Sequence, residues 1–142
     1  MAHASPPPSA TDSLQLDCAM RMFLIEIAAL MELPASAADA LANLSPVRGG
    51  GGFLCRLELA RQAPAAVRPE VLLPIGLSDL TGADVEPLLL LQEALAAELR
   101  WRLGLSVDGR LRLTTMDWID DPSDAAFAMD LGQFLGRDAM RA

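Results

Sequence analysis

The chain has 142 residues, and its 19 acidic and 11 basic residues give a formal net charge of −8 with the single histidine neutral. This balance argues against a nucleic acid as the main partner, because a polyanion would be repelled. The length is that of one domain. Hydrophobic residues make up 52% of the chain, more than a single small core absorbs, so apolar surface is expected to face a partner.

Residues 1–12 contain three consecutive prolines and few large apolar side chains, so we expect a disordered tail, followed by one domain over residues 13–142. The start lacks the basic and apolar regions of a secretory signal. No apolar stretch reaches the roughly 20 uninterrupted residues of a membrane span. Cys18 and Cys55 lie far apart without a Cys-x-x-Cys motif, which is typical of thiols in a reducing compartment. These features predict a cytoplasmic protein with no membrane insertion.

The first helix is predicted from about residue 12 to Pro34. Apolar residues recur on one face of it: Leu16, Met20, Phe23, Leu24, Ile27, Leu30 and Met31. Its opposite face also carries apolar side chains, among them Met22 and Ile25. The following segment, 35–52, is rich in Ala, Ser and Gly and predicts a mobile connection with one short element, in which the four glycines at 49–52 form a flexible linker.

Two strands are predicted next. Residues 53–60 alternate, with Cys55 and Leu57 on the inner side and Leu54 on the outer side. A second strand covers residues 70–77, where Pro74 has no N–H group and therefore belongs at a sheet edge or at the end of the strand. A third strand within residues 41–47 is left open by the pattern.

A second helix is predicted from Asp84, as its N-cap, to about Leu103, before Gly104. It carries one apolar stripe for its own sheet and a second stripe at a different angle: Leu90, Ala94, Ala97 and Trp101. A second stripe fits either another element of the same chain or a two-fold interface. We favour a homodimer interface, because the chain has few elements to cover both stripes, the alanines permit close approach and the Trp supplies an anchor.

A hairpin over residues 105–119 turns at Asp108-Gly109, the clearest turn signal in the chain. Along its second strand Leu111 and Leu113 point inward, and Met116 and Trp118 point outward, where they line an exposed groove. A last helix opens at Asp121 and is expected to pack through one face, made of Phe127, Leu131, Phe134 and Leu135. The predicted fold is therefore α+β: helix, strands, helix, hairpin and helix, with a twisted antiparallel sheet packed with helices in a homodimer.

The sequence offers little for catalysis. His3 is the only histidine and lies in the predicted tail, and there is no lysine, so imidazole and Schiff-base chemistry are excluded from the domain. The densest acidic group, at residues 117, 120, 121 and 124, is explained by helix capping and exposed strand positions better than by a cation. We therefore expect no enzymatic activity, no cofactor and no metal site.

The apolar strand Val71–Leu77 with its Pro and Gly, the Leu-rich helix over 85–103 and the hairpin over 105–119 resemble the class I effector chaperones of bacterial type III secretion. The resemblance covers residues 14–135, although the family usually has three strands between its first two helices. It implies a cytoplasmic homodimer without enzymatic activity. Such a dimer binds the N-terminal region of effector proteins, keeps it soluble and passes it to the secretion apparatus, whose ATPase is a further partner.

The faces of the first helix and of the strands that lie opposite the predicted core indicate where an effector segment binds. They carry Met22 and Ile25 on the first helix, Leu54 on the first strand, and Met116 and Trp118 at the end of the hairpin. The acidic net charge favours a basic segment as cargo. The same stripes are also compatible with a dimeric regulatory or scaffolding module that has no part in secretion, and a small carboxylate-dependent enzyme is the third alternative.

Overall fold

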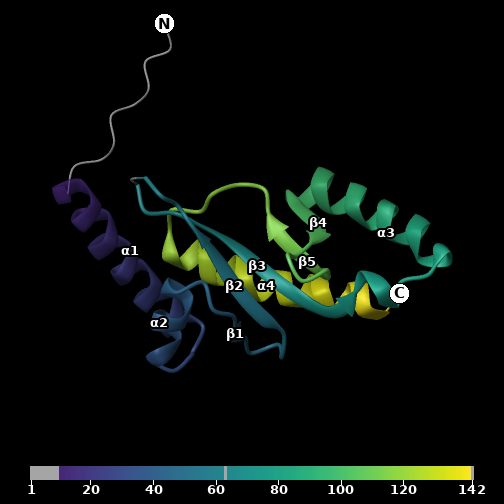
Figure 1. Cartoon of the computed structure of the whole chain (residues 1–142), viewed down its shortest axis with the longest axis horizontal. Helices are drawn as coiled ribbons and strands as arrows, with labels where there is room; N and C mark the ends of the chain where they lie inside the picture. The colour runs from purple at the N-terminus through teal and green to yellow at the C-terminus, as the bar shows by residue number, and fades with distance from the viewer. Residues whose placement is uncertain (1–9, 63, 142) are drawn as a thin grey trace, which may run out of the picture.

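A computed structural model describes residues 10–62 and 64–141, with side chains described for residues 17–62 and 64–140. Its helices are α1 (Ala10–Leu30), α2 (Ser36–Ala42), α3 (Gly82–Ala94) and α4 (Pro122–Arg141). Its strands are β1 (Val47–Arg48), β2 (Leu54–Leu59), β3 (Val67–Gly76), β4 (Trp101–Leu105) and β5 (Arg110–Thr115). The predicted α+β class is confirmed (Figure 1). Most of the predicted tail lies outside the described residues, and α1 begins within it, at Ala10.

The five strands form one antiparallel sheet in the order β1-β2-β3-β5-β4. Strand β1 is the third strand that the pattern left open between the first two long helices. Strand β3 begins at Val67, three residues earlier than predicted, because Val67 pairs with Leu59 on β2. Pro74 is not at a sheet edge, since β3 is central. It lies near the end of β3, between Leu72 and Gly76, where the pairing with β5 is irregular. A residue without an N–H group is tolerated there, because no regular strand-to-strand hydrogen bond is lost.

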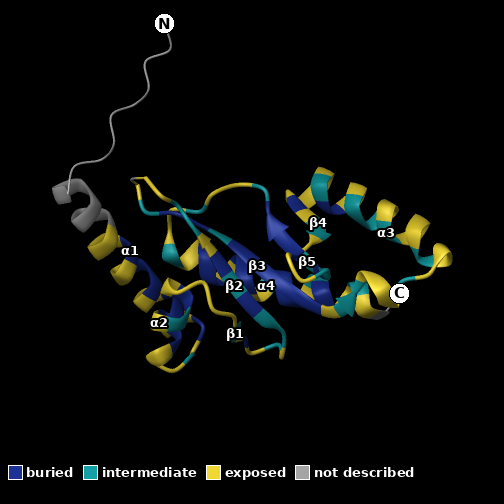
Figure 2. Cartoon of the chain, viewed as in Figure 1, coloured by how far each residue is buried: buried dark blue, intermediate teal, exposed yellow. Residues whose placement is uncertain are grey.

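One face of the sheet carries the core (Figure 2). Cys55 and Leu57 of β2 are fully buried on this face, as the alternation predicts. Helix α1 buries Met20, Phe23, Leu24, Ile27 and Met31, in agreement with the predicted stripe. Leu30 is 48% exposed and does not belong to the core, and the side chain of Leu16 lies outside the described residues. Helical spacing therefore identifies most of the buried face of α1.

Helix α4 packs through the opposite face from the one predicted. Phe127 and Phe134 are 69% and 57% exposed, whereas Ala125, Met129 and Gly132 are buried. The reason is a close approach between helix and sheet: a methyl group on Gly132 would lie 2.5 Å from the Trp101 ring. No large side chain fits beside the Trp101 ring at that position, so Phe127 and Phe134 turn outward, whereas Leu135 of the predicted face is partly buried against the core.

The predicted N-cap of α4 is confirmed. The Asp121 carboxylate accepts hydrogen bonds from the backbone N–H groups of Ser123 and Asp124, at 2.8 and 3.1 Å. These two donors have no partner within the helix itself. Asp121 therefore closes the first turn of α4, and this role accounts for its place in the acidic group at residues 117–124.

The four glycines at 49–52 are not a flexible linker. They form the turn between β1 and β2, closed by the Gly49 N–H, which donates to the carbonyl of Phe53 at 2.9 Å. The turn packs against Gln133 of α4, which is 2% exposed and accepts a hydrogen bond from the Gly51 N–H at 2.8 Å. A β-carbon on Gly51 would lie 2.9 Å from the same amide oxygen. Glycine is needed here because the turn approaches a buried side chain.

The second long helix is shorter than predicted. Its N-cap is Thr81, and Asp84 is the third helical residue, whose carboxylate accepts from the Thr81 N–H at 2.7 Å. A π-helical turn follows at Leu95–Leu99, and Arg100 adopts the left-handed conformation with φ 55°. The chain then enters β4 at Trp101. Among the described helices, we find none with the length and apolar character required to cross a membrane.

Cys55 provides a pH test of the core. Burial raises the pKa of its thiol from 9.0 to about 12, because the thiolate would lose its hydration. Between about pH 9 and pH 12 the unfolded chain releases this proton and the folded chain retains it. The contribution of Cys55 to the free energy of unfolding is therefore constant below about pH 9 and falls above it, by about 1.4 kcal/mol per pH unit. The sequence has no Tyr or Lys to obscure the effect.

The measurement is urea unfolding between pH 8 and pH 11 in a Cys18→Ser background, which removes the exposed thiol. The Cys18→Ser protein should lose stability above pH 9, and the Cys18→Ser, Cys55→Ala protein should not. Equal slopes in the two proteins would mean that Cys55 is not a buried thiol.

Candidate functional site

Helix α3 is only sparsely covered by the rest of the described chain. None of its thirteen residues is buried, and Figure 1 shows it beside β4 at the edge of the molecule. Its inner side, with Leu88 and Leu91, packs only partly against the core. On its outer side Leu89 and Leu90 are 61% and 60% exposed. Exposed apolar side chains on a largely solvent-exposed helix are typical of an interface.

The predicted interface residues separate into two groups. Leu90, Ala94 and Ala97 are exposed, on α3 and the π-helical turn that follows it. Trp101 is 2% exposed and belongs to β4, where its ring contacts Gly132 of α4. The assignment of Trp101 to the interface was wrong, because the helix ends before this residue and the strand directs its side chain into the core.

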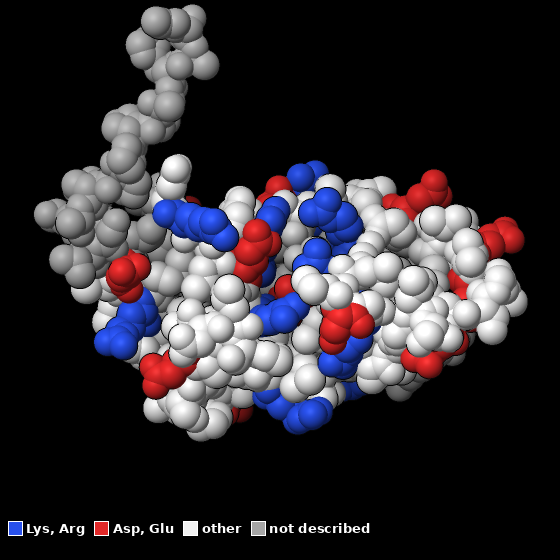
Figure 3. All heavy atoms as spheres, in the orientation of Figure 1, with Lys and Arg blue, Asp and Glu red and all other residues white. Residues whose placement is uncertain are grey.

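The face of the sheet opposite α4 has no helix packed on it in Figure 1, and we call it the open face. Leu54 lies on this face beside Leu72 of β3, and both are partly or fully covered by neighbouring side chains. Met116 follows β5, half-buried, and its N–H donates to the carbonyl of Arg100 at 2.9 Å. Figure 3 shows arginine side chains gathered over the strands on this side of the molecule.

Trp118 lies at one end of the open face. Its side chain is 45% exposed, and the Arg68 guanidinium stacks on the ring 4.4 Å from its centroid. Arg68 in turn donates to both carboxylate oxygens of Glu58, at 2.7 and 2.8 Å. The indole is therefore held in place by a cation on one side, while its other parts remain accessible to a ligand.

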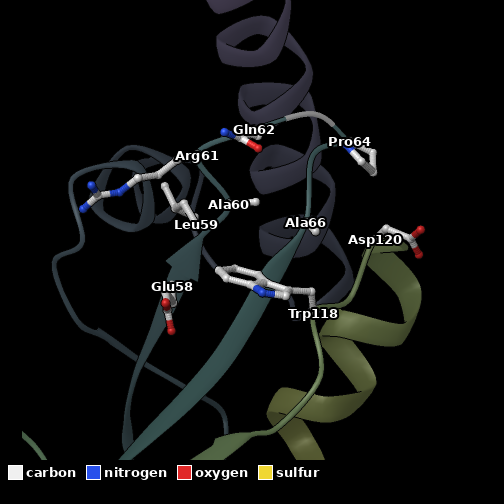
Figure 4. A pocket seen from close by; sticks show the side chains of 9 residues that line it. All are labelled: Glu58, Leu59, Ala60, Arg61, Gln62, Pro64, Ala66, Trp118 and Asp120. Atoms are coloured by element: carbon white, nitrogen blue, oxygen red, sulfur yellow. The ribbon is translucent and has the colours of Figure 1, made fainter. Parts of the chain in front are cut away.

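A cavity of about 600 Å³ opens next to Trp118 (Figure 4). The indole lies opposite Ala60 and Ala66, at the end of β2 and the approach to β3, and Leu59 adds a further apolar wall. Asp120 lies at the rim. An adjoining cavity of about 430 Å³ shares the end of β2 with it and reaches α1. The end of β2 thus lies between two hollows with apolar walls.

A further cavity of about 580 Å³ lies between α1 and α2. Ile25, which is 47% exposed, lines it together with Leu24 and Ala38. Arg21 and Asp39 supply its charged groups. Met22 is 67% exposed on α1 but does not line this cavity. An apolar side chain of a peptide fits such a groove between helices.

The five predicted cargo residues therefore fall in two places. Met22 and Ile25 lie on α1, and Leu54, Met116 and Trp118 lie on or beside the open face. The apolar walls of the Trp118 cavity were not predicted from the sequence; they come from Leu59 and Ala60, at the end of β2, and from Ala66, before β3. A turn rich in Ala and Pro was the only signal for them.

One ion pair lies next to the Trp118 cavity, between Arg100 and Asp117. The Arg100 guanidinium donates two hydrogen bonds to Asp117, at 2.6 and 2.9 Å, and holds the pKa of that carboxyl below its usual range. Within residues 17–62 and 64–140, no three His, Cys, Asp or Glu side chains are grouped as metal ligands. The described cavities thus offer apolar walls and charged side chains.

Comparisons of the chain with protein-family models, curated proteins and solved structures found no match.

Proposed function

We propose that this chain is a class I chaperone of type III secretion. It acts in the bacterial cytoplasm as a homodimer without enzymatic activity, cofactor or metal. It binds the N-terminal region of effector proteins, keeps that region soluble and passes it to the secretion apparatus. The observation that carries the proposal is α3, a helix with no buried residue and exposed leucines, placed between the first three strands and the final hairpin.

The order of elements supports the proposal. Helix α1, strands β1 to β3, helix α3, the β4–β5 hairpin and helix α4 follow the order of that chaperone family, including three strands before the central helix. Helix α2 is an addition to this order. The similarity concerns arrangement alone, so the function rests on whether the exposed surfaces bind what such a chaperone binds.

A second copy of the chain is the partner we assign to α3. A two-fold axis brings the same surface of both copies together, so the apolar stripe on α3 of one copy packs against the same stripe of the other. Leu90 with the small residues Ala94 and Ala97 would form the contact. Dimerisation through α3 leaves the open face and the α1–α2 groove available for cargo.

Cargo binding is assigned to the cavities near Trp118 and between α1 and α2. Both have apolar walls and openings at the surface, which suit single side chains of an extended segment. A peptide crossing from one to the other passes the end of β2, where the adjoining cavity lies. The bound segment stays unfolded because its apolar side chains are held by the chaperone instead of by each other.

The test uses the full chain and N-terminal segments of secreted proteins encoded by neighbouring genes. We expect one such segment to bind a dimer and to lack its own secondary structure by circular dichroism. Trp118→Ala should weaken binding by about thirtyfold, corresponding to the ~2 kcal/mol of an aromatic anchor buried by the ligand, and Ile25→Asp, in the α1–α2 groove, should weaken it too. Phe127→Ala is the control, since this exposed aromatic residue lies on α4.

Thermal unfolding of each variant separates binding from folding. The two cargo variants should unfold close to the wild-type temperature, because both side chains are about half exposed and lie outside the core. Normal binding by both variants would place the cargo elsewhere. Binding of a single folded regulator, with no affinity for any secreted N-terminus, would overturn the secretion function in favour of a regulatory or scaffolding module.

A further inference from the structure

The strands of this acidic protein are basic. Of its 11 basic residues, six lie in strands: Arg48, Arg56, Arg68, Arg102, Arg110 and Arg112. Of its 19 acidic residues, only Glu58 and Glu70 lie in strands. The remaining acidic side chains belong to helices, turns and the chain ends. Positive charge is therefore concentrated on the sheet while the protein as a whole is negative.

The register places these charges on the open face. Arg56 lies opposite Glu70, Glu70 opposite Thr114, and Thr114 opposite Arg102, which makes one row across four strands. Cross-strand partners share a face of the sheet. A parallel row runs from Arg48 through Leu54 and Leu72 to Arg112. The intervening residues of β5, Leu111 and Leu113, are buried on the core face.

The ion pairs on the open face do not neutralise all of its arginines. Glu70, which is 6% exposed, accepts from Arg56 at 2.8 Å and faces Arg112 at 3.4 Å, so one carboxylate serves two guanidinium groups. Arg112 Nε is buried and has no hydrogen-bond partner among the described residues. The Arg112 side chain as a whole is 37% exposed, so its outer guanidinium nitrogens are open to a ligand carboxylate.

Two further arginines carry little compensation. Arg102 is exposed on the edge strand β4, and no ion pair joins it to another described residue. Arg110 donates through Nε to the carbonyl of Leu73 at 3.3 Å, and no ion pair joins it to another described residue, although Asp108 in the hairpin turn is an acidic neighbour. Both guanidinium groups therefore keep donors for a ligand.

We infer that the open face binds an extended peptide segment with acidic side chains at alternate positions. The inference rests on the proposed function, of which it names the preferred cargo chemistry. Alternate residues of an extended chain are about 6.8 Å apart, the same repeat that separates Arg110 from Arg112 along β5. Guanidinium groups bind carboxylates through paired hydrogen bonds. The face thus reverses the expectation, drawn from net charge, that the cargo is basic.

A peptide is favoured over a nucleic acid by the charges around the face. The helices bordering the sheet carry most of the acidic residues, and Figure 3 shows acidic groups on the side of α3. A long polyanion would extend beyond the basic strands and meet this negative surface. A short acidic segment stays within the sheet.

The experiment measures binding of three synthetic peptides to the full chain. Each has about twelve residues, enough to extend along β5 and beyond both of its ends, and alternates Thr with Glu, Gln or Lys. The Glu peptide should bind best and lose affinity as salt rises. The double variant Arg102→Gln, Arg110→Gln should weaken it by roughly three- to tenfold, the range for exposed ion pairs. Arg137→Gln, on the exposed side of α4, should not.

Other outcomes would overturn the inference. Equal affinity for the Gln peptide, preference for the Lys peptide, or tighter binding of a single-stranded oligonucleotide than of the Glu peptide would each contradict an acidic-peptide site. The result is separable from the proposed function. If an effector segment binds and depends on Trp118 while the three peptides bind alike, the chaperone function stands and the charge preference fails.

Discussion

Trp101→Ala is expected to lower the free energy of unfolding by about 3–5 kcal/mol, the usual cost of removing a buried Trp. The ring is 2% exposed and lies between β4 and α4, where it occupies the space left by Gly132. Alanine at position 101 would leave the volume of the indole ring empty. Urea unfolding at one fixed protein concentration measures the change, with Trp118 as the remaining fluorescent indole.

A double-mutant cycle with Gly132 tests the contact itself. Gly132→Ala alone should destabilise the protein, because its methyl group would lie 2.5 Å from the ring. In the Trp101→Ala background the same change should cost less, since the ring is gone. A Trp101→Ala protein that keeps wild-type stability but becomes monomeric would restore Trp101 to the interface, where the sequence analysis placed it.

If α3 forms the proposed dimer, Ala94→Glu is expected to convert it to a monomer, with a dissociation constant raised by at least about a hundredfold, because a carboxylate would be buried at the interface without a partner. The folded monomer should be unaffected, since Ala94 is exposed at the end of α3. Sedimentation at micromolar concentration should give twice the monomer mass for the wild type and the monomer mass for the variant.

The same substitution elsewhere supplies the control. Ala29 is exposed on α1, so Ala29→Glu adds an equal charge to a helix outside the proposed interface and should leave the dimer intact. Leu90→Glu should act like Ala94→Glu, because its side chain is 60% exposed on the same helix. A wild-type monomer, or dissociation by Ala29→Glu as well, would contradict a dimer built on α3.

The sequence by itself determined the elements whose pattern is local. The spacing of Met20, Phe23 and Ile27 identifies the buried face of α1, and the alternation around Cys55 identifies that of β2, because each periodicity repeats over several residues. The hairpin turn at Asp108-Gly109 was equally predictable. Gly109 adopts φ 81°, a conformation that glycine adopts without a steric penalty.

Tertiary contacts decided the cases in which two local patterns competed. Residues 100–103 continue a helical pattern, yet they enter β4, because Leu103 pairs with Leu113 on β5 and Trp101 fills the space above α4. On α4 an aromatic stripe and a stripe of small residues both have helical spacing. The close approach of α4 to the sheet at Gly132 favours the face that carries the small residues, and no single segment shows how close two elements will come.

In the candidate site, too, some features follow from local sequence patterns and others from tertiary contacts. Alternation showed that Arg110 and Arg112 share a side of their strand, and it identified Met116 and Trp118 as outward residues. It could not show that Arg56 and Arg102, distant in sequence, join them on one face, because that depends on the strand order β2-β3-β5-β4. Periodicity determines which side chains of one segment lie together. Strand pairing and the distance between packed layers determine which segments meet and which of their faces remain exposed.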